Sequence, residues 1–218
     1  ARETLSETWP MTEKGRGLCV GRPFKGVELR IAKLQEGAAD SFEELATGEI
    51  GEILVRSPHL SAGYLDDPAS DRKNKIDGWH RLGDAGYLDE RGRLWVVGRV
   101  GHRVRTASGL LFPLMVEPIF DAHPKVRRTG LVGVPRPGGE LPVLCVELLH
   151  EHRNAPHEEL RRELLELGAA YDTSRNVREV LFLDALPVDP RHQSKIERPR
   201  LAKWAAGELE KSGRRRSA

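Results

Sequence analysis

One acidic side chain lies where the sequence could present it to a ligand. Asp84 is in the polar segment 79–87 (WHRLGDAGY), directly after Gly83 and two residues before Gly86. A carboxylate on a glycine-flanked turn can accept hydrogen bonds from two vicinal hydroxyls, as acidic residues do on a nucleotide ribose. An Asp that caps a turn gives the same local pattern. This segment alone favours the turn-capping interpretation.

Two cations could complete such a site. Arg99 follows the apolar run ending VVG, and its guanidinium could bridge a sugar hydroxyl or a phosphate. Lys195 lies in the polar segment 187–196 (PVDPRHQSKI), for which we predict a loop before the last helix. Its ammonium could reach a phosphate or carboxylate on which charge develops. Taken one at a time, each is more often a solvated surface charge.

Other catalytic and metal-binding patterns are missing from the sequence. The histidines lack zinc-type spacing except in 150–152 (HEH), which we interpret as a solvated strand end. We therefore predict no metal site. Neither a GxSxG nucleophile elbow nor a GxxxxGK[ST] phosphate loop occurs. Any nucleotide that binds here must be held partly by residues elsewhere.

Short strands in the first half of the chain must position Asp84 and Arg99. Apolar or alternating runs of four to eight residues, separated by Gly, Asp or Pro, predict antiparallel strands. These runs are 19–23, 26–34, 51–57 and 92–98. Residues 89–92 (DERG) predict a hairpin turn, and 67–70 (DPAS) predict the start of a short helix or loop.

After Arg99 helices alternate with strands, which predicts a small α+β module. We expect helices at 113–123, 158–170 and 199–210, and strands at 129–135, 141–149 and 178–184. Val116, Ile119 and Phe120 share one face of the first helix. Pro118 lies inside that helix, where a proline removes a backbone hydrogen bond. The spacing of the residues does not explain why a proline is placed there. The change of pattern near 99–101 is a candidate hinge.

Composition excludes several functional classes. The chain has 218 residues and a net charge of +2, of which the tail 211–218 (KSGRRRSA) supplies +4, so the rest carries −2. We expect this tail to be disordered and nucleic-acid binding to be absent, because a nucleic-acid binder carries its basic patch on the fold. No apolar run approaches the roughly 20 residues that span a bilayer. Cys19 and Cys145 stand singly, which favours a cytoplasmic setting.

Seven segments, in order, resemble the adenylate-forming superfamily of acyl-CoA synthetases, luciferases and adenylation domains. Their patterns resemble family motifs such as GxELRI, GEIxVRG, GWxxTGD, LxxxGR, PxxxE, HPxV and SGKI. The segments are 18–31, 48–56 with 63–65 (GYL), 78–84 (GWHRLGD), 94–99 (LWVVGR), Pro113 with Glu117, 123–126 (HPKV) and 193–196 (QSKI).

The resemblance implies a fold and residue roles. The fold would be α+β: residues 1–98 the β-rich, distorted barrel-like end of a large domain, and 99–210 a mobile lid with a short sheet. Asp84 and Arg99 would bind the ribose of ATP, which Mg²⁺ accompanies. Lys195 would bridge the acyl carboxylate and the α-phosphate. Gly101 would be the hinge, where the family usually has Asp or Lys.

Two departures from the family pattern bear on the reaction. The loop that lines the family's CoA tunnel is glycine-rich, whereas here it reads Thr106, Ala107, Ser108 and Gly109. The segments 104–120, which include this loop, and 125–134 resemble the β-lactone-forming branch of bacterial olefin biosynthesis. The family's phosphate loop and YGxTE segment would lie before Ala1, so we expect this chain to be inactive alone.

Three functions therefore stay open. The first is adenylation of a long-chain 2-alkyl-3-hydroxy acid and its closure to a β-lactone, beside other enzymes of the pathway. The second is a fatty-acyl-CoA synthetase, which needs CoA. The third is a non-catalytic interaction module in which Asp84 and Lys195 are surface charges and the basic tail contacts an acidic partner.

Overall fold

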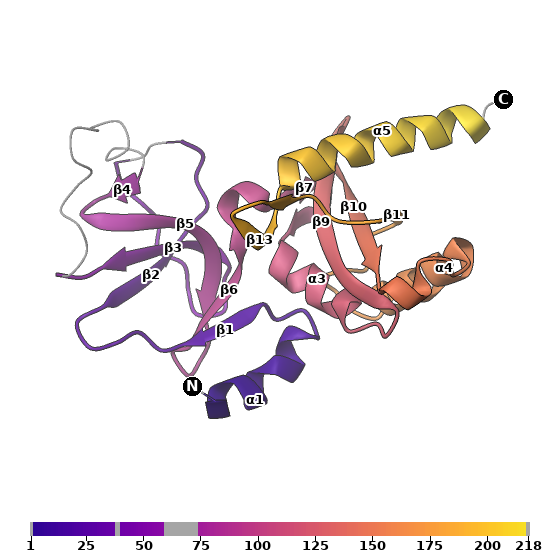
Figure 1. Cartoon of the computed structure of the whole chain (residues 1–218). Helices are drawn as coiled ribbons and strands as arrows, with labels where there is room; N and C mark the ends of the chain where they lie inside the picture. Colours follow the sequence, from indigo (N-terminus) through magenta and orange to yellow (C-terminus); the bar gives the residue numbers. More distant parts are fainter. Residues whose placement is uncertain (1, 38–39, 59–73, 217–218) are drawn as a thin grey trace. The chain divides into compact units, whose positions relative to one another are not determined.

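The computed structural model describes residues 2–37, 40–58 and 74–216 (Figure 1). The helix or loop start expected at 67–70 and the 63–65 motif lie outside the described residues. The chain divides into two compact units: residues 1–10 with 16–101, and residues 11–15 with 102–218.

The first unit is built on one antiparallel sheet. Its strand order is β1-β6-β5-β3-β2, and β4 pairs with β5. The elements are α1 (Arg2–Thr12), β1 (Leu18–Gly21), β2 (Glu28–Ala32), β3 (Gly51–Arg56), β4 (Lys75–Ile76), β5 (Trp79–Leu88) and β6 (Leu94–Arg99). The predicted antiparallel strands are thus confirmed. Among the described residues β1 and β2 end the strand order without pairing with each other, so the sheet is open and the barrel-like form is not closed.

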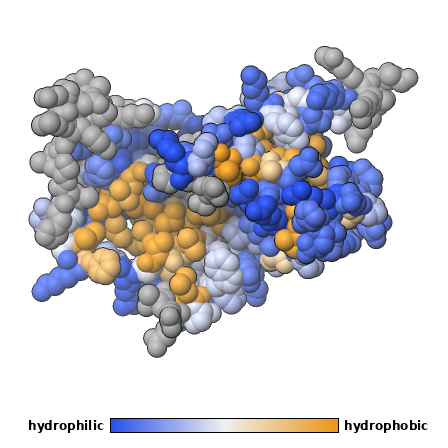
Figure 2. All heavy atoms as spheres, viewed as in Figure 1, coloured by the Kyte–Doolittle hydropathy of each residue, from blue (hydrophilic) through white to orange (hydrophobic). Residues whose placement is uncertain are grey.

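The inner strand β3 is covered on both faces. Ile53 and Val55 pack in a cluster with Ile31 and Leu94, whereas Leu54 packs on the opposite face with Trp79. This alternation follows from the two-residue period of a strand. Apolar side chains also gather on the viewed surface of this unit (Figure 2). Its exposed large apolar residues are Leu5, Trp9, Val20, Phe24 and Leu82.

The predicted turn at 89–92 joins β5 to β6. Gly92 N donates to Asp89 O at 2.8 Å, and the Asp89 carboxylate accepts from Trp95 Nε1 at 2.9 Å and Arg93 Nε at 2.7 Å. Burial alone would raise the pKa of Asp89, but the hydrogen bonds from Trp95 and Arg93 outweigh it and lower the pKa to about 2. The turn is therefore stabilised by a carboxylate that stays charged.

Asp89→Asn is expected to lose more stability at neutral pH than in acid. Because the folded pKa lies below the ordinary value of 3.8, the charged carboxylate stabilises the fold above about pH 4 and that contribution disappears as pH falls toward 2. The loss at pH 7 should be about 2 kcal/mol. Urea unfolding followed by tryptophan fluorescence at pH 7 and pH 3 measures it. Equal losses at both pH values would contradict this assignment.

The second unit packs helices on both faces of a three-stranded sheet. The sheet has the order β11-β10-β9, with β10 antiparallel to β9 and parallel to β11. The elements are η1 (Val100–His102), β7 (Val104–Thr106), β8 (Gly109–Leu111), α3 (Pro113–Asp121), β9 (Val126–Arg136), β10 (Gly139–Leu148), η2 (His150–His152), α4 (His157–Ala169), β11 (Glu179–Leu183), β12 (Val188–Asp189), β13 (His192–Ile196) and α5 (Arg198–Arg216). The α+β class is confirmed.

Two apolar clusters hold this unit together. Val116, Ile119 and Phe120 of α3 are buried with Leu160 and Leu164 of α4 on one side of the sheet, as the predicted helix faces require. The second cluster contains Leu186, Leu201 and Ala205, the last two from α5. Pro113 begins α3, a position that favours proline, and Pro118 is its sixth residue, within the second turn.

Three segments differ from the predictions. Residues 187–196 are not a loop, because β12 and β13 pair there as a short antiparallel hairpin. Residues 150–152 form a 3-10 turn rather than a strand end. The last helix does not stop at residue 210, and 211–216 of the expected disordered tail are helical. The Lys211 to Glu208 ion pair at 2.7 Å supports this extension across one helical turn.

Candidate functional site

Asp84 and Arg99 meet across neighbouring strands. They are register partners of β5 and β6, and Arg99 Nε lies 3.1 Å from Asp84 Oδ1. Arg99 Nη1 also donates to Leu82 O at 3.0 Å. The sequence predicted both residues as candidates, and the β5-β6 hairpin brings them together.

Glycines shape the backbone at both positions. Gly83 directly precedes Asp84 at φ +69°, and Gly98 directly precedes Arg99 at φ +143°. These angles favour glycine, so each strand can turn sharply just before its candidate site residue. A register shift opposite Ala85 and Gly86 leaves Val97 of β6 unpaired, so β6 carries a bulge two residues before Arg99.

The pair remains accessible to a ligand. The Asp84 side chain is 28% exposed and the Arg99 side chain 59%. Burial raises the pKa of Asp84 and the neighbouring Arg99 charge lowers it, with burial the larger effect. Within the part of the chain that the structure describes, Arg99 is paired with one oxygen of this carboxylate, and hydroxyl groups of a ligand could donate further hydrogen bonds to it.

Lys195 lies in the second unit on β13. The β12-β13 hairpin pairs Val188 with Ile196 and Asp189 with His192. The Lys195 side chain is exposed, and no ion pair or hydrogen bond holds its ammonium within the part of the chain that the structure describes. A short strand therefore presents this cation to solvent, whereas the sequence predicted a loop.

Gly101 is in η1, between β6 and β7. Its φ lies outside the left-handed range, and a Cβ built on it would meet nothing within 4 Å. The conformation seen here therefore does not require glycine.

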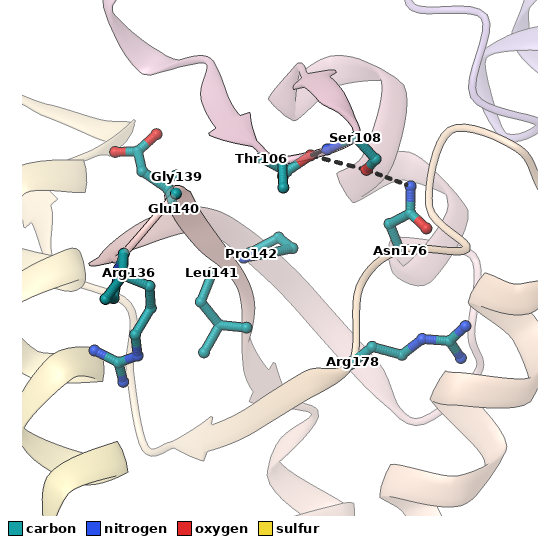
Figure 3. A pocket seen from close by; sticks show the side chains of 12 residues that line it. Thr106, Ser108, Arg136, Gly139, Glu140, Leu141, Pro142, Asn176 and Arg178 are labelled. Atoms are coloured by element: carbon teal, nitrogen blue, oxygen red, sulfur yellow. Dashed lines mark hydrogen bonds between the residues drawn. The ribbon is translucent and has the colours of Figure 1, made fainter.

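The segment 106–109 forms the tip of the β7-β8 hairpin. Thr106 Oγ1 donates to Gly109 O at 2.8 Å and accepts from Ser108 N at 3.2 Å, and it lies 3.0 Å from Ser108 Oγ. Asn176 Nδ2 donates to Ser108 Oγ at 3.1 Å. Side-chain hydrogen bonds thus tie this tip to the loop before β11, as Figure 3 shows.

A cavity of about 350 Å³ opens beside this hairpin tip. Arg136 and Arg178 lie on its wall with Leu141 and Pro142 between them (Figure 3). Sequence reasoning identified the hairpin tip but missed Asn176, Arg136 and Arg178, because no motif spacing links them to it. Their proximity depends on the pairing of β9, β10 and β11.

The described residues contain no group of three His, Cys, Asp or Glu side chains that could hold a metal ion. Within the same residues, no helix is long and apolar enough to cross a membrane. Cys19 and Cys145 are both buried free thiols.

Comparison with solved structures identifies the class of protein. An ATP-bound RpMatB-BxBclM chimera matches with a TM-score of 0.73 and 28% identity over 86% of this chain and 36% of its own. The amide bond synthetase McbA of Marinactinospora thermotolerans matches with a TM-score of 0.72 and 31% identity over 85% of this chain and 36% of its own. No protein-family model matches the chain. On fold and sequence, the chain resembles the C-terminal part of adenylate-forming enzymes.

Proteins similar in sequence include two olefin β-lactone synthetases and an acyl-CoA ligase. The chain is 43% identical to the olefin β-lactone synthetase of Xanthomonas campestris, over 93% of this chain and 39% of the relative. It is 41% identical to that of Stenotrophomonas maltophilia, over 95% of this chain and 39% of the relative. The putative acyl-CoA ligase YdaB of Bacillus subtilis is 36% identical over 60% of this chain and 25% of its own length. The chain thus spans less than half the length of these relatives.

Proposed function

We propose that this chain provides ribose-binding and charge-stabilising groups to an ATP-dependent ligase that forms a β-lactone. The observation that carries the proposal is the accessible Asp84–Arg99 pair, joined at 3.1 Å across β5 and β6. The similarity to two olefin β-lactone synthetases over more than nine-tenths of the chain supports the choice of reaction. The substrate would be a long-chain 2-alkyl-3-hydroxy acid.

The reaction has two steps. In the first, a carboxylate oxygen of the acid attacks the α-phosphorus of ATP, an O–P bond forms, and pyrophosphate leaves. In the second, the 3-hydroxyl oxygen of the same molecule attacks the acyl carbon, AMP leaves, and the hydroxyl proton is released. The tethered hydroxyl needs no second substrate, and holding it near the acyl carbon lowers the entropic cost of ring closure.

Each candidate residue has a defined part in the first step. Asp84 would accept hydrogen bonds from the two ribose hydroxyls, and Arg99 would hold Asp84 in place while donating to the ribose. Lys195 would place its ammonium against the acyl carboxylate and the α-phosphate, where negative charge accumulates. These side chains orient the reactants and stabilise charge, and none becomes covalently modified.

ATP is the nucleotide that the proposal requires, and Mg²⁺ would accompany its phosphates. The ion would neutralise phosphate charge. CoA enters only in the alternative reaction below.

The proposed domain roles follow from the family. Residues 99–210 would act as a mobile lid that turns about Gly101. A Cβ added at Gly101 would meet no atom within 4 Å, so the space around this residue is open.

The free thiols of Cys19 and Cys145 support a cytoplasmic setting. Other enzymes that make the hydroxy acid or consume the lactone would be its pathway partners.

The alternative is a fatty-acyl-CoA synthetase, which the similarity to YdaB favours. Mass spectrometry of the products separates the two. The complete gene product should convert a syn 2-alkyl-3-hydroxy acid, ATP and Mg²⁺ into a compound lighter than the acid by one water, with or without CoA. An acyl-CoA product would favour the synthetase, whereas no release of AMP would favour an interaction module.

Asp84→Asn is expected to raise the KM for ATP by about tenfold or more, because a charged acceptor facing the ribose hydroxyls is lost. The kcat of adenylation should fall less than the KM rises, since ribose contacts bind the ground state and transition state alike. Initial rates of pyrophosphate release at varied ATP measure both constants. Arg91→Ala, an exposed arginine in the turn at the far end of the same hairpin, is the control. An unchanged KM for ATP would remove Asp84 from the nucleotide site.

A further inference from the structure

The hairpin that carries Lys195 is fixed at its exit by a buried ion pair. Arg198 begins α5 three residues after Lys195. Its guanidinium donates to Glu117 Oε1 at 2.5 Å and Oε2 at 3.0 Å, and also to Leu131 O at 2.9 Å. Glu117 Oε1 in turn accepts from Leu131 N at 2.6 Å. Both side chains are mostly buried, 8% exposed for Glu117 and 14% for Arg198.

A second buried carboxylate fixes the entry to the same hairpin. Leu186 N, two residues before β12, donates to Glu147 Oε2 at 2.9 Å. The Glu147 side chain is fully buried and also accepts from Arg127 Nη1 at 2.6 Å and Arg128 Nε at 2.8 Å. Burial would raise the pKa of Glu147, but the Leu186 amide and Arg128 outweigh it and lower the pKa. The entry is thus held by a charged acceptor.

The two ends are also joined to each other and packed on the sheet. Glu197 N donates to Pro187 O at 2.8 Å, which closes the base of the hairpin. Beneath it, a Cβ on Gly130 of β9 would lie 2.7 Å from Leu201, 3.4 Å from Leu186 and 3.6 Å from Ile196. Glycine at this position lets the hairpin base and α5 approach the strand closely. Lys195, by contrast, is exposed beyond this fixed base.

We propose that Glu117 and Glu147 are positioning residues that clamp the two ends of the β12-β13 hairpin and thereby hold Lys195 at the reacting phosphate. The proposal rests on the proposed adenylation function. Neither carboxylate needs to touch the substrate, because Glu117 acts through Arg198 and Glu147 through the Leu186 amide. A catalytic group misplaced by about 1 Å loses on the order of 100-fold in rate. Figure 1 shows β13 leading directly into α5, so movement at Arg198 passes to Lys195 over three residues.

A buried ion pair by itself is weak evidence for added stability, since desolvation offsets much of the attraction. The two clamps differ from a general stabilising contact in one respect: Glu117 binds the Arg198 side chain just after the hairpin, and Glu147 binds the Leu186 amide just before it. Loss of a clamp should therefore impair catalysis only when Lys195 is present. That coupling separates positioning from general damage to the fold.

The test is a double-mutant cycle in the complete gene product, read by ATP–pyrophosphate exchange with the 3-hydroxy acid. Arg198→Ala should lower the kcat of adenylation about 10- to 100-fold and change the KM for ATP by less than about threefold. In a Lys195→Ala background the same change should cost less than about threefold. Arg198→Lys, which keeps the charge, should recover part of the rate. Amide hydrogen exchange at Glu197 should become faster in Arg198→Ala.

Asp89→Asn is the matched control, because it removes a mostly buried, arginine-paired carboxylate in the first unit, whereas the hairpin belongs to the second. It should keep the wild-type kcat despite its loss of stability. If Arg198→Ala costs as much with Lys195 absent as with it present, or leaves kcat unchanged, the clamp is overturned while the proposed function stands. If Lys195→Ala itself leaves adenylation unchanged, the proposed function fails. If Arg198→Ala does not fold, the same double-mutant cycle is run with Arg198→Lys. In that case a wild-type kcat for Arg198→Lys would overturn the proposed clamp.

Discussion

Lys195→Ala is expected to lower the rate of acyl-adenylate formation about 100- to 1000-fold, the usual cost of removing one donor from developing charge. The side chain is exposed on β13, so its removal should leave the fold intact. The KM for ATP should change little, because the ammonium acts mainly as charge builds between the acyl carboxylate and the α-phosphate. ATP–pyrophosphate exchange measures the effect.

Two further variants sharpen this result. Lys203→Ala removes another exposed lysine of the second unit, on α5, and should behave as wild type. Lys195→Arg keeps the charge but replaces a compact ammonium with a planar guanidinium, so it should restore the rate only in part. A Lys195→Ala enzyme that retains full exchange activity would show that Lys195 is a surface charge.

Phe120→Ala is expected to cost about 3 to 5 kcal/mol of unfolding free energy, the typical loss for a buried aromatic residue. The Phe120 side chain is fully buried in the cluster of α3 and α4. A Cβ on Gly168 of α4 would lie 2.7 Å from the Phe120 ring, so the two helices meet closely around this ring and truncation leaves a cavity between them. Chemical denaturation of the chain measures the loss.

Phe120→Leu is the control for Phe120→Ala, because it keeps most of the apolar volume and should lose distinctly less stability. Leu110→Ala, at an exposed position in β8, should change stability by no more than about 0.5 kcal/mol. If Phe120→Ala were as stable as Leu110→Ala, the α3-α4 contact would not form part of the core.

Local sequence patterns were sufficient to predict most of the helices and strands. The helix face of Val116, Ile119 and Phe120 is buried as its spacing predicts, and the alternation in β3 sends Ile53 and Leu54 to opposite sides of the sheet. Both signals depend on neighbours in the chain, so they can be read without knowing the fold. The polar composition of 187–196 was misleading, because a short hairpin with few apolar residues resembles a loop in sequence.

For the candidate site, sequence alone determined which residue types were available and their order: Asp84 and Arg99 around a hairpin turn, then Lys195 before the last helix. Only the tertiary structure decided what supports them. Glu117 and Arg198 are 81 residues apart and Glu147 and Leu186 are 39 apart, yet each pair shares a hydrogen bond. Such contacts depend on how α3 and α5 pack on the sheet that contains β10, which no local spacing encodes. Long-range packing therefore determines how firmly Lys195 is held.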